Sequence, residues 1–355
     1  MTTTMGDVAR RAGVSVATVS RVLNGDYPVA EHTRERVHAA VRDLGYVANA
    51  HARALIKSTS GTVRVILHDV LDPYFAEIVK GIQQVADEHG LLVLICSSER
   101  DPAREIAYIE MLRGQRVDGV IVTTGYVDDD EFLSALHEQA RGLRGQGSGL
   151  VFCGRYPVRA PAVVPDNAGG AFRITTHLLE AGHRRIAHLA GPARFSTTMD
   201  RLQGYSGALA SFGVAVDPLL VANGDFSRDG TYDSCLRIID SGADFTAIFA
   251  ANDLMAIGAL AALRDRGLEV PRDVSVVGFD DISIARDLTP PLTTVAVPMN
   301  EMGRRAMRLI LEPPPPDELV VHLPTEVVIR GSVARVGDAA DHDGPAHVAG
   351  PSSDR

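Results

Sequence analysis

From residue 61 onward, short runs of apolar and β-branched residues alternate with longer amphipathic segments. This alternation constrains the fold most, because strands separated by helices form parallel sheets joined by right-handed crossovers. One small sheet cannot hold so many strands, so the pattern predicts a body of two lobes of similar build. The predicted strands are 63–67, 91–96, 117–123, 150–153, 186–189, 219–222, 247–250 and 274–279, and the predicted helices include 75–88, 104–112, 168–179, 201–211 and 253–264.

The two predicted lobes divide near residues 159–164, and two later segments, 292–297 and 320–329, are expected to cross back between them. The tail at 337–355 is rich in Gly, Ala, Asp and Pro and lacks apolar periodicity, which predicts disorder. The expected body at 61–336 has a first lobe at about 61–160 and 291–321 and a second lobe at about 162–289 and 323–336.

Three short helices are predicted within residues 1–47. Thr4 is expected to cap the first helix, Gly13 to end it and Ser15 to cap the second, which runs through Leu23. A third helix is predicted at 31–44 and lacks a good capping residue at its start. This arrangement predicts an all-α helix-turn-helix domain ahead of the α/β body.

The outer face of the predicted second helix is small and polar, with Arg21 as its one long donor. Small residues at the helix start allow close approach to a major groove, where an arginine reaches a guanine edge. Ser15, Thr18 and Ser20 suit phosphate oxygens. An ordinary helical hairpin is the alternative, but the glycine turn and the outer Thr, Ser and Arg side chains favour DNA binding.

The charge distribution agrees with a nucleic-acid partner, although the net charge of the chain is −10. Residues 1–60 contain eight Lys and Arg against five Asp and Glu, a net of +3. The remainder contains 27 basic and 40 acidic residues, a net of −13. A basic head on an acidic body directs phosphate to the head alone.

We expect a cytoplasmic protein. No stretch approaches the roughly 20 apolar residues of a membrane span, and the first residues do not form a secretory signal. The three cysteines are scattered in apolar runs, which predicts reduced, buried thiols. Because neither metal-ligand spacing nor an acid–base pair stands out, the sequence predicts no metal, no cofactor and no enzymatic activity.

The segments DVARRAGVSVATVSRVLNG and TRERVHAAVRDLGYVANAHARAL resemble the lactose-repressor (LacI/GalR) family of bacterial regulators, and the likeness extends from about Met5 to Val336. The resemblance implies a periplasmic-binding-protein-like body of two Rossmann-like subdomains. It also implies that Val16, Ala17 and Arg21 take base-reading positions. The predicted DNA-binding residues are Thr4, Ser15, Val16, Ala17, Thr18, Ser20, Arg21, Asn24, Asn49, Ala52, Arg53 and Leu55.

Residues 48–60 form a predicted hinge helix and linker, and the resemblance implies that a leucine here, Leu55, enters the minor groove. A helix this short is marginal in water, so it is expected to order only beside its dimer mate on DNA. A plain linker is the alternative.

Polar and aromatic side chains follow the predicted strands of the body, where open α/β lobes bind ligands. Aromatic rings pack on sugar faces, while Arg, Asn and Asp bind hydroxyl groups. The motifs also match the family's effector pocket, although Asp72 alone suits a helix cap and Tyr74 or Phe75 alone suits a core. The predicted effector-binding residues are Asp72, Tyr74, Phe75, Thr123, Arg155, Arg201, Phe226, Asn252 and Asp280.

The chain departs from the family pattern at two positions. Many sugar-binding members carry an Asp after the fourth strand, where this chain has Gly154 followed by Arg155. The purine-responsive branch carries an Arg where this chain has Phe195. These differences leave the sugar open and argue against a purine. The glycine-rich segment 142–149 precedes a strand instead of following one, so it is expected to be a surface loop.

These patterns together predict a homodimeric repressor of a palindromic operator, switched by a small sugar-like effector. The alternative is a solute-binding component of sugar transport with the same two-lobed body, which the DNA head argues against. A dehydrogenase or sugar-modifying enzyme is disfavoured because Gly-x-Gly-x-x-Gly does not follow the first strand. The effector, the operator and the direction of the effector's action stay open.

Overall fold

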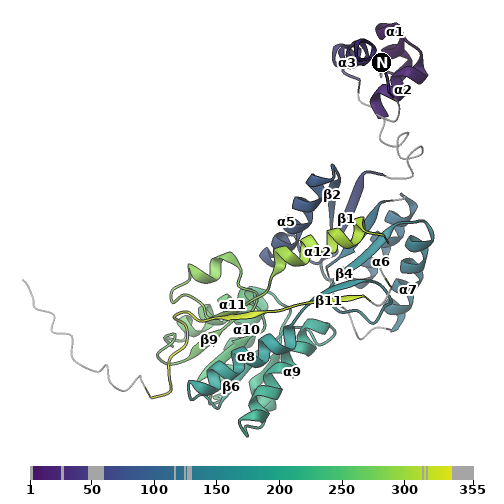
Figure 1. Cartoon of the computed structure of the whole chain (residues 1–355). Helices are drawn as coiled ribbons and strands as arrows, with labels where there is room; N and C mark the ends of the chain where they lie inside the picture. Colours follow the sequence, from purple (N-terminus) through teal and green to yellow (C-terminus); the bar gives the residue numbers. More distant parts are fainter. Residues whose placement is uncertain are drawn as a thin grey trace, which may run out of the picture. The chain divides into compact units, whose positions relative to one another are not determined.

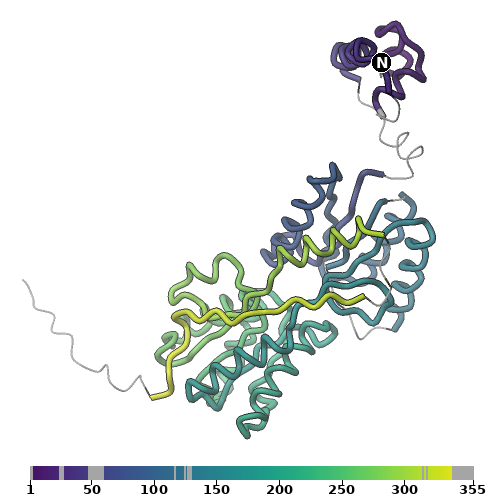
Figure 2. Tube along the Cα trace, in the orientation of Figure 1, coloured from purple at the N-terminus to yellow at the C-terminus, as the bar shows by residue number. Residues whose placement is uncertain are grey.

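The computed structural model describes residues 3–24, 28–46, 60–115, 117–123, 125, 130–313, 316 and 319–337. The chain divides at Gly61 into two compact units, which are treated separately below (Figure 1). Figure 2 shows the path of the chain through each unit.

The first unit contains the three predicted helices, which are confirmed. Thr4 and Asp7 form a capping box at the start of the first helix, and Gly13 ends it in the left-handed conformation with φ 64°. Val8, Val19 and Val37 are fully buried in the small core between the helices. The helices are α1 (Met5–Ala12), α2 (Val16–Asn24) and α3 (Glu31–Leu44).

Two arginines connect these helices. Arg36 on α3 donates to the carbonyl oxygens of Ala12 and Gly13, the latter at 3.2 Å, and so holds the turn between α1 and α2. Arg11 pairs with Asp43 at 2.8 Å. The turn is therefore fixed by hydrogen bonds from the Arg36 side chain to the backbone as well as by the apolar core.

The first lobe of the second unit contains a parallel sheet with strand order β11-β5-β4-β3-β1-β2. Helices α5 and α12 cover one face of it, and α6 and α7 cover the other. The strands are β1 (Thr62–Leu67), β2 (Leu92–Ser97), β3 (Gly119–Val122), β4 (Gly149–Cys153), β5 (Ala162–Pro165) and β11 (Val320–Leu323), and the helices are α5 (Pro73–Glu88), α6 (Pro102–Gly114), α7 (Asp130–Gly145) and α12 (Met299–Leu311).

The second lobe contains a parallel sheet with strand order β7-β6-β8-β9, between α8 and α9 on one face and α10 and α11 on the other. Strands β10 and β12 form an antiparallel ribbon of their own. The elements are β6 (Ile186–Ala190), β7 (Val221–Asn223), β8 (Ala247–Ala250), β9 (Ser275–Val277), β10 (Thr294–Ala296), β12 (Glu326–Val328), α8 (Asn167–Glu180), α9 (Ser196–Ser211), α10 (Arg228–Asp240), α11 (Asp253–Asp265) and the short helices η1 (Pro218–Leu220) and η2 (Ser283–Arg286).

The structure corrects the predicted division of the body. Strand β5 pairs with β4 and β11 in the first sheet, so this lobe continues to Pro165 instead of ending near residues 159–164. The predicted crossing segment at 320–329 contains two strands, β11 and β12, because Pro324 follows β11 and cannot donate to a ladder. Strand β7 begins only at Val221, because Asp217 caps a helical turn before it.

Helices α10 and α12 were not among the predicted helices. The predicted loop at 142–149 is partly wrong, since α7 continues to Gly145. Leu136, Ala140 and Leu143 lie at helical spacing and are buried, so burial outweighs the two glycines at the end of this helix.

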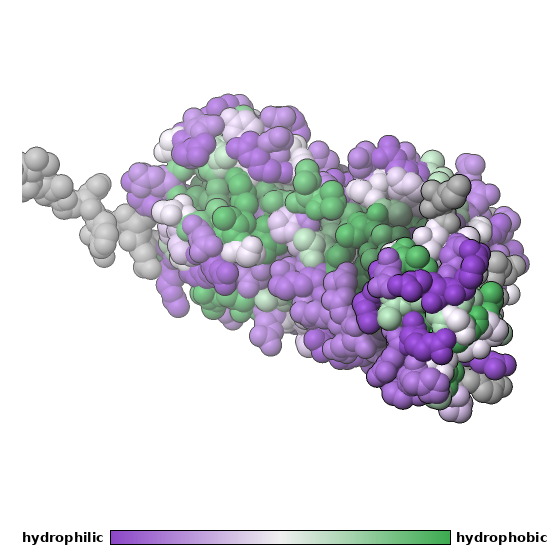
Figure 3. Space-filling view, turned by 90° about the horizontal axis from the view of Figure 1, so that it is seen from above, coloured by the Kyte–Doolittle hydropathy of each residue, from purple (hydrophilic) through white to green (hydrophobic). Residues whose placement is uncertain are grey.

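The surface of the second unit carries exposed apolar side chains on the edge strand β2. Leu92 is 56% exposed, Leu94 38% and Ile95 46%. Figure 3 shows apolar residues exposed among hydrophilic ones on the visible face of the second unit. Exposed apolar side chains that lie together on one strand are typical of an interface with another chain.

Helices α5 and α12 meet backbone to backbone. A Cβ atom at Gly81 would lie 2.0 Å from the carbonyl oxygen of Asn300, and one at Gly303 would lie 2.0 Å from that of Ile78. Only glycine permits this approach at either position. The contact holds α12, which follows β10, against the first lobe.

We predict that Gly303→Ala lowers the free energy of unfolding by about 1–3 kcal/mol, because the methyl group forces the two helices apart. The control is Gly114→Ala at the end of α6, where an added Cβ meets nothing within 4 Å. Urea unfolding followed by far-UV circular dichroism measures both. Equal stability of the two variants would contradict the close approach.

Candidate functional site

The first candidate site is the start of α2. The Oγ atom of Ser15 accepts from the Thr18 amide at 3.1 Å and lies 2.9 Å from Thr18 Oγ1, so Ser15 caps the helix as predicted. Val16 is 50% exposed, and Ala17 and Arg21 are also exposed. Apolar and small side chains left at the start of a helix leave room for close approach to a groove.

A shallow groove runs along this helix. It is lined by residues of α2 and of the segment that leads into α3, including Ser15, Thr18, Arg21, Pro28 and Thr33. Ser20 is half-buried. Thr4 is exposed, but its hydroxyl lies 2.6 Å from the Asp7 carboxylate in the capping box, so it has a structural partner already. The side chain of Asn24 and the predicted residues Asn49, Ala52, Arg53 and Leu55 lie outside the described part of the chain.

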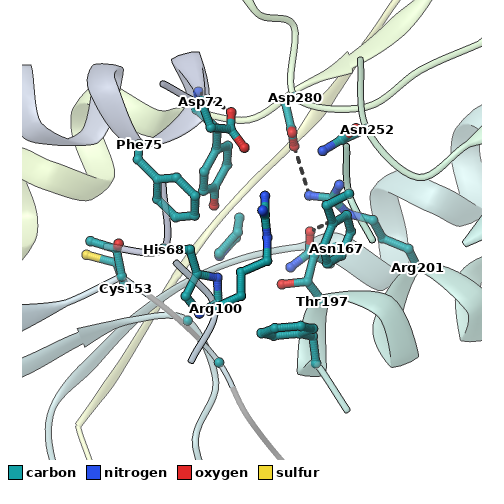
Figure 4. Close-up of a pocket in the computed structure, with 17 residues that line it drawn as sticks. His68, Asp72, Phe75, Arg100, Cys153, Asn167, Thr197, Arg201, Asn252 and Asp280 are labelled. Carbon is teal, nitrogen blue, oxygen red and sulfur yellow. Dashed lines mark hydrogen bonds and ion pairs between the residues drawn. The ribbon is translucent and has the colours of Figure 1, made fainter. Parts of the chain in front are cut away.

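The second candidate site is a pocket at the carboxyl ends of both sheets (Figure 4). The lining residues follow strands or begin helices, as the rule for open α/β sheets predicts. They are His68, Asp72, Tyr74, Phe75, Arg100, Thr123, Gly125, Cys153, Gly154 and Pro165 from the first lobe, and Asn167, Phe195, Thr197, Arg201, Phe226, Asn252 and Asp280 from the second.

All of the predicted effector residues line this cavity except Arg155. Its side chain is half-exposed and pairs with Asp200 on α9, outside the cavity lining. The preceding residue, Gly154, has a φ of 147°, and the side chain that follows this turn leaves the cavity. The placement of Arg155 in the cavity is therefore wrong.

The Arg201 guanidinium lies at the centre of the second-lobe wall. Its Nε donates to Asn167 Oδ1 at 3.0 Å, its Nη2 to Asp280 at 2.9 Å and its Nη1 to a backbone carbonyl, that of Ala251. It also lies 3.8 Å from the centre of the Phe279 ring. The Arg201 and Asp280 side chains are only 3% and 6% exposed, so this is a buried ion pair.

Asp280 connects the cavity to β10. It has a φ of 107°, an uncommon conformation for a residue with a Cβ atom. Its amide donates to the Val295 carbonyl at 2.8 Å, and its own carbonyl accepts from Val297 at 3.3 Å. The buried Asp253 carboxylate accepts from the Ile282 amide at 2.9 Å and from Thr294 Oγ1 at 2.6 Å. These two hydrogen bonds connect the turn at Asp280 to β10.

The protonation of the cavity is set mainly by burial. Burial raises the pKa of Asp280 to about 7, and the Arg201 guanidinium opposes this shift. Burial also raises the pKa of Asp72, which caps α5 by accepting from the Tyr74 amide at 3.0 Å. Burial, followed by the charges of Arg100 and Arg194, lowers the pKa of His68 to about 3, so this ring is neutral at neutral pH.

Aromatic rings form a continuous wall beside these groups. The His68 ring meets Phe75 edge-on at 5.8 Å and Phe195 at 5.0 Å, and Phe195 meets Phe226 at 5.8 Å. A flat ligand face packs on such a wall, while the Asn252 and Asp280 side chains offer hydrogen-bond partners.

Several lining residues were not predicted as effector contacts: His68, Arg100, Asn167, Phe195 and Thr197. His68 and Asn167 each directly follow a strand or begin a helix, so the strand-end rule could have found them. Arg100 comes after β2 in a turn with positive φ, which the residue types do not signal.

The described residues contain no group of His, Cys, Asp and Glu that could hold a metal ion. The same part of the chain has no helix long and apolar enough to cross a membrane.

A helix-turn-helix unit and a two-lobed body with a pocket lined from both lobes define a DNA-binding transcription regulator. The family described as bacterial regulatory proteins, lacI family, matches residues 4–49, and the periplasmic binding protein-like domain matches residues 175–333. The chain is 38% identical over 309 residues to the HTH-type transcriptional repressor CytR of Escherichia coli (strain K12), which covers 87% of this chain and 89% of CytR. The chain belongs to the lacI family of bacterial regulatory proteins, which confirms the family and fold class predicted from the sequence.

Other relatives match over nearly the whole chain. The HTH-type transcriptional regulator GalR of Escherichia coli (strain K12) is 37% identical, covering 96% of this chain and 98% of GalR. The structure of a lac repressor dimer bound to operator and the anti-inducer ONPF is similar with a TM-score of 0.82 and 27% identity, covering 94% of this chain and 100% of that one. A complex of the regulator CelR with cellobiose has a TM-score of 0.69 and 35% identity, covering 93% and 99%.

We predict that Arg201→Ala lowers the free energy of unfolding of the body by about 3–5 kcal/mol, because it leaves the Asp280 charge buried and unpaired. The matched control is Arg155→Ala, which breaks an exposed ion pair and is expected to cost about 0–1 kcal/mol. Urea unfolding of the full chain measures the difference. If both variants lost a similar free energy of unfolding, the buried pair of Arg201 and Asp280 would contribute no more to stability than an exposed ion pair.

Proposed function

We propose that this chain is a cytoplasmic repressor that binds a palindromic operator as a homodimer and responds to a small sugar-like effector. The observation that carries the proposal is the cavity in which polar and aromatic side chains meet from the strand ends of both lobes, in a chain that also carries a helix-turn-helix unit. The lac repressor dimer on its operator and the cellobiose complex of CelR support both halves of it.

The DNA contact is assigned to α2. Its N-terminal amides and the Ser15 and Thr18 hydroxyls suit phosphate, while Val16, Ala17 and Arg21 face outward for the base edges. An arginine donates to two acceptors of guanine at once, so Arg21 is proposed as the main source of sequence preference.

The dimer is proposed to form through the body. Exposed Leu92, Leu94 and Ile95 lie on the edge strand β2, where a second copy can cover apolar surface that a monomer leaves in water. Two heads on a two-fold axis require an operator of matching symmetry. The predicted hinge helix with Leu55 would then pair with its mate at the operator's centre.

The switch is proposed to be a change in the angle between the lobes. The cavity takes its lining from both lobes, and a ligand that touches both favours one arrangement over the other. A ligand shifts such an equilibrium only by its differential affinity for the two states, typically about 1–3 kcal/mol.

The transport hypothesis uses the same body but leaves the head without a role. A solute-binding component has no use for a capped helix with an outward arginine, so the head favours regulation. Operator binding by the full chain decides between the two.

We predict that Arg21→Ala weakens binding to the specific operator by about 1–3 kcal/mol and weakens binding to random DNA much less, because a base contact is lost while the phosphate contacts stay. Fluorescence anisotropy with both DNAs at one salt concentration measures the ratio. Equal losses on both DNAs would refute the base-reading role.

We predict that Asp72→Asn weakens effector binding about tenfold or more, because one carboxyl oxygen is replaced by an amide nitrogen that cannot accept, while the amide oxygen still caps α5. The control is Asp101→Asn, the same change at the cap of α6 outside the cavity lining. The probe is the mono- or disaccharide that most raises the melting temperature of the wild-type chain, since saturation at 100 times Kd adds about 2.7 kcal/mol.

Titrating operator DNA with and without that sugar completes the test. The sugar should change the operator affinity of the wild-type chain and of Asp101→Asn at a concentration that leaves Asp72→Asn unaffected. A full response in Asp72→Asn would place the effector elsewhere.

A further inference from the structure

Arg100 enters the cavity from a strained turn in the first lobe. Glu99 and Arg100 follow β2 with φ values of 53° and 61°, and two consecutive residues with side chains rarely adopt this conformation. Two backbone hydrogen bonds hold the turn against β1: the Ser98 amide donates to the Leu67 carbonyl at 2.8 Å, and the Glu99 amide donates to the His68 carbonyl at 2.7 Å. The Arg194 side chain donates to the Arg100 carbonyl at 3.3 Å. Strain that the surroundings maintain in this way is typical of ligand clamps.

The Arg100 guanidinium lacks the partners that Arg201 has. Figure 4 shows its side chain extended into the cavity. Its Nε is buried without a hydrogen-bond partner in the described part of the chain, and the Asp69 carboxylate lies 4.0 Å from its Nη1. A buried donor left unpaired is costly, so a group with acceptors is expected to fill this place.

Arg100 meets the Asp69 carboxylate only at 4.0 Å, a longer contact than the 2.9 Å pair of Arg201 and Asp280. Asp280 is already paired with Arg201, and Asp72 caps α5. Strand β4 ends at Cys153 and Gly154, which bring no carboxylate to the lining. A second guanidinium, that of Arg194, lies near enough to join Arg100 in lowering the pKa of His68. Two guanidinium groups therefore lie near the first-lobe end of the cavity, where Arg100 also interacts with the charges of Asp69 and Asp225.

We propose that the effector is a sugar-sized molecule with an anionic group, a phosphate or a carboxylate, which Arg100 binds. The planar fork of a guanidinium matches two oxygens of either group, and such charge-assisted pairs are about twice as strong as neutral hydrogen bonds. The aromatic wall of Phe75, Phe195 and Phe226 then packs on the sugar, and Asn252 and Asp280 take its hydroxyls. This inference rests on the proposed function and adds the chemical class of its ligand.

The test compares neutral sugars with their anionic partners on the full chain. Glucose, galactose and ribose are each paired with the corresponding sugar phosphate, and the two hexoses also with their uronates, with inorganic phosphate alone as the smallest probe. Thermal shift at constant ionic strength, followed by calorimetry, gives the affinities. At least one anionic sugar should bind about tenfold tighter than its neutral partner, and the phosphate and uronate arms identify the group.

Three variants show whether Arg100 is responsible. Arg100→Gln should bring the ratio of anionic to neutral affinity close to one, and Arg100→Lys should retain part of it, because the charge stays while the fork is lost. Arg264→Gln removes an exposed arginine on α11, outside the cavity lining, and should keep the wild-type ratio. An anionic preference that survives Arg100→Gln, or a wild-type chain that never prefers the anionic partner, would overturn the proposal.

Operator titration with the same probes separates this inference from the proposed function. A chain that binds operator and responds to neutral sugars alone would keep the proposed function and refute the anionic ligand. A chain that binds no operator would refute the proposed function instead.

Discussion

The buried pair of Arg201 and Asp280 is the interaction on which the cavity depends. Burying two charges is expensive unless each finds partners that replace water. Here Arg201 donates hydrogen bonds to Asn167 on α8, to the Ala251 carbonyl after β8 and to Asp280 after β9. One guanidinium therefore fixes the mutual positions of elements that form the second-lobe wall.

The same pair sets how ligand binding reaches the rest of the body. The Asp280 backbone is hydrogen-bonded to Val295 and Val297, on either side of the end of β10, and α12 begins directly after that segment. Helix α12 is in turn held against α5 by the glycine contact at Gly81 and Gly303. A shift at Asp280 thus passes through short, rigid connections to the first lobe. Packed backbones of this kind move as units instead of deforming locally.

Local chemistry in the sequence was enough to predict much of the fold. The capping box at Thr4, the glycine stops of the head and the alternation of strands and helices in the body all agree with the structure. Residues 162–165 were assigned to the second lobe because four buried residues do not indicate which sheet they join. That choice is made by pairing with β4 and β11, which lie far apart in the sequence.

The lining residues of the cavity could be predicted from the sequence where they directly follow a strand. Asp72, Thr123, Asn252 and Asp280 lie where the rule for open α/β sheets places them. Arg100 was missed and Arg155 wrongly included for the same physical reason. Both follow turns with positive φ, at Glu99 and at Gly154, and such a turn decides whether the next long side chain enters the cavity or leaves it. Residue type alone does not determine that direction.

In the proposed switch, the coupling free energy of the ligand is similar in size to the free energy that holds the predicted hinge helix together. A helix as short as the one predicted at 49–57 is marginal alone, so its stability on DNA depends on where the two bodies of a dimer hold its ends. A ligand coupling of about 1–3 kcal/mol is small against the cost of breaking a buried ion pair, but it is comparable to the balance of a marginal helix. In the proposed switch, a cavity held by a buried ion pair and a predicted hinge helix of marginal stability would together turn a weak ligand preference into a change in operator affinity.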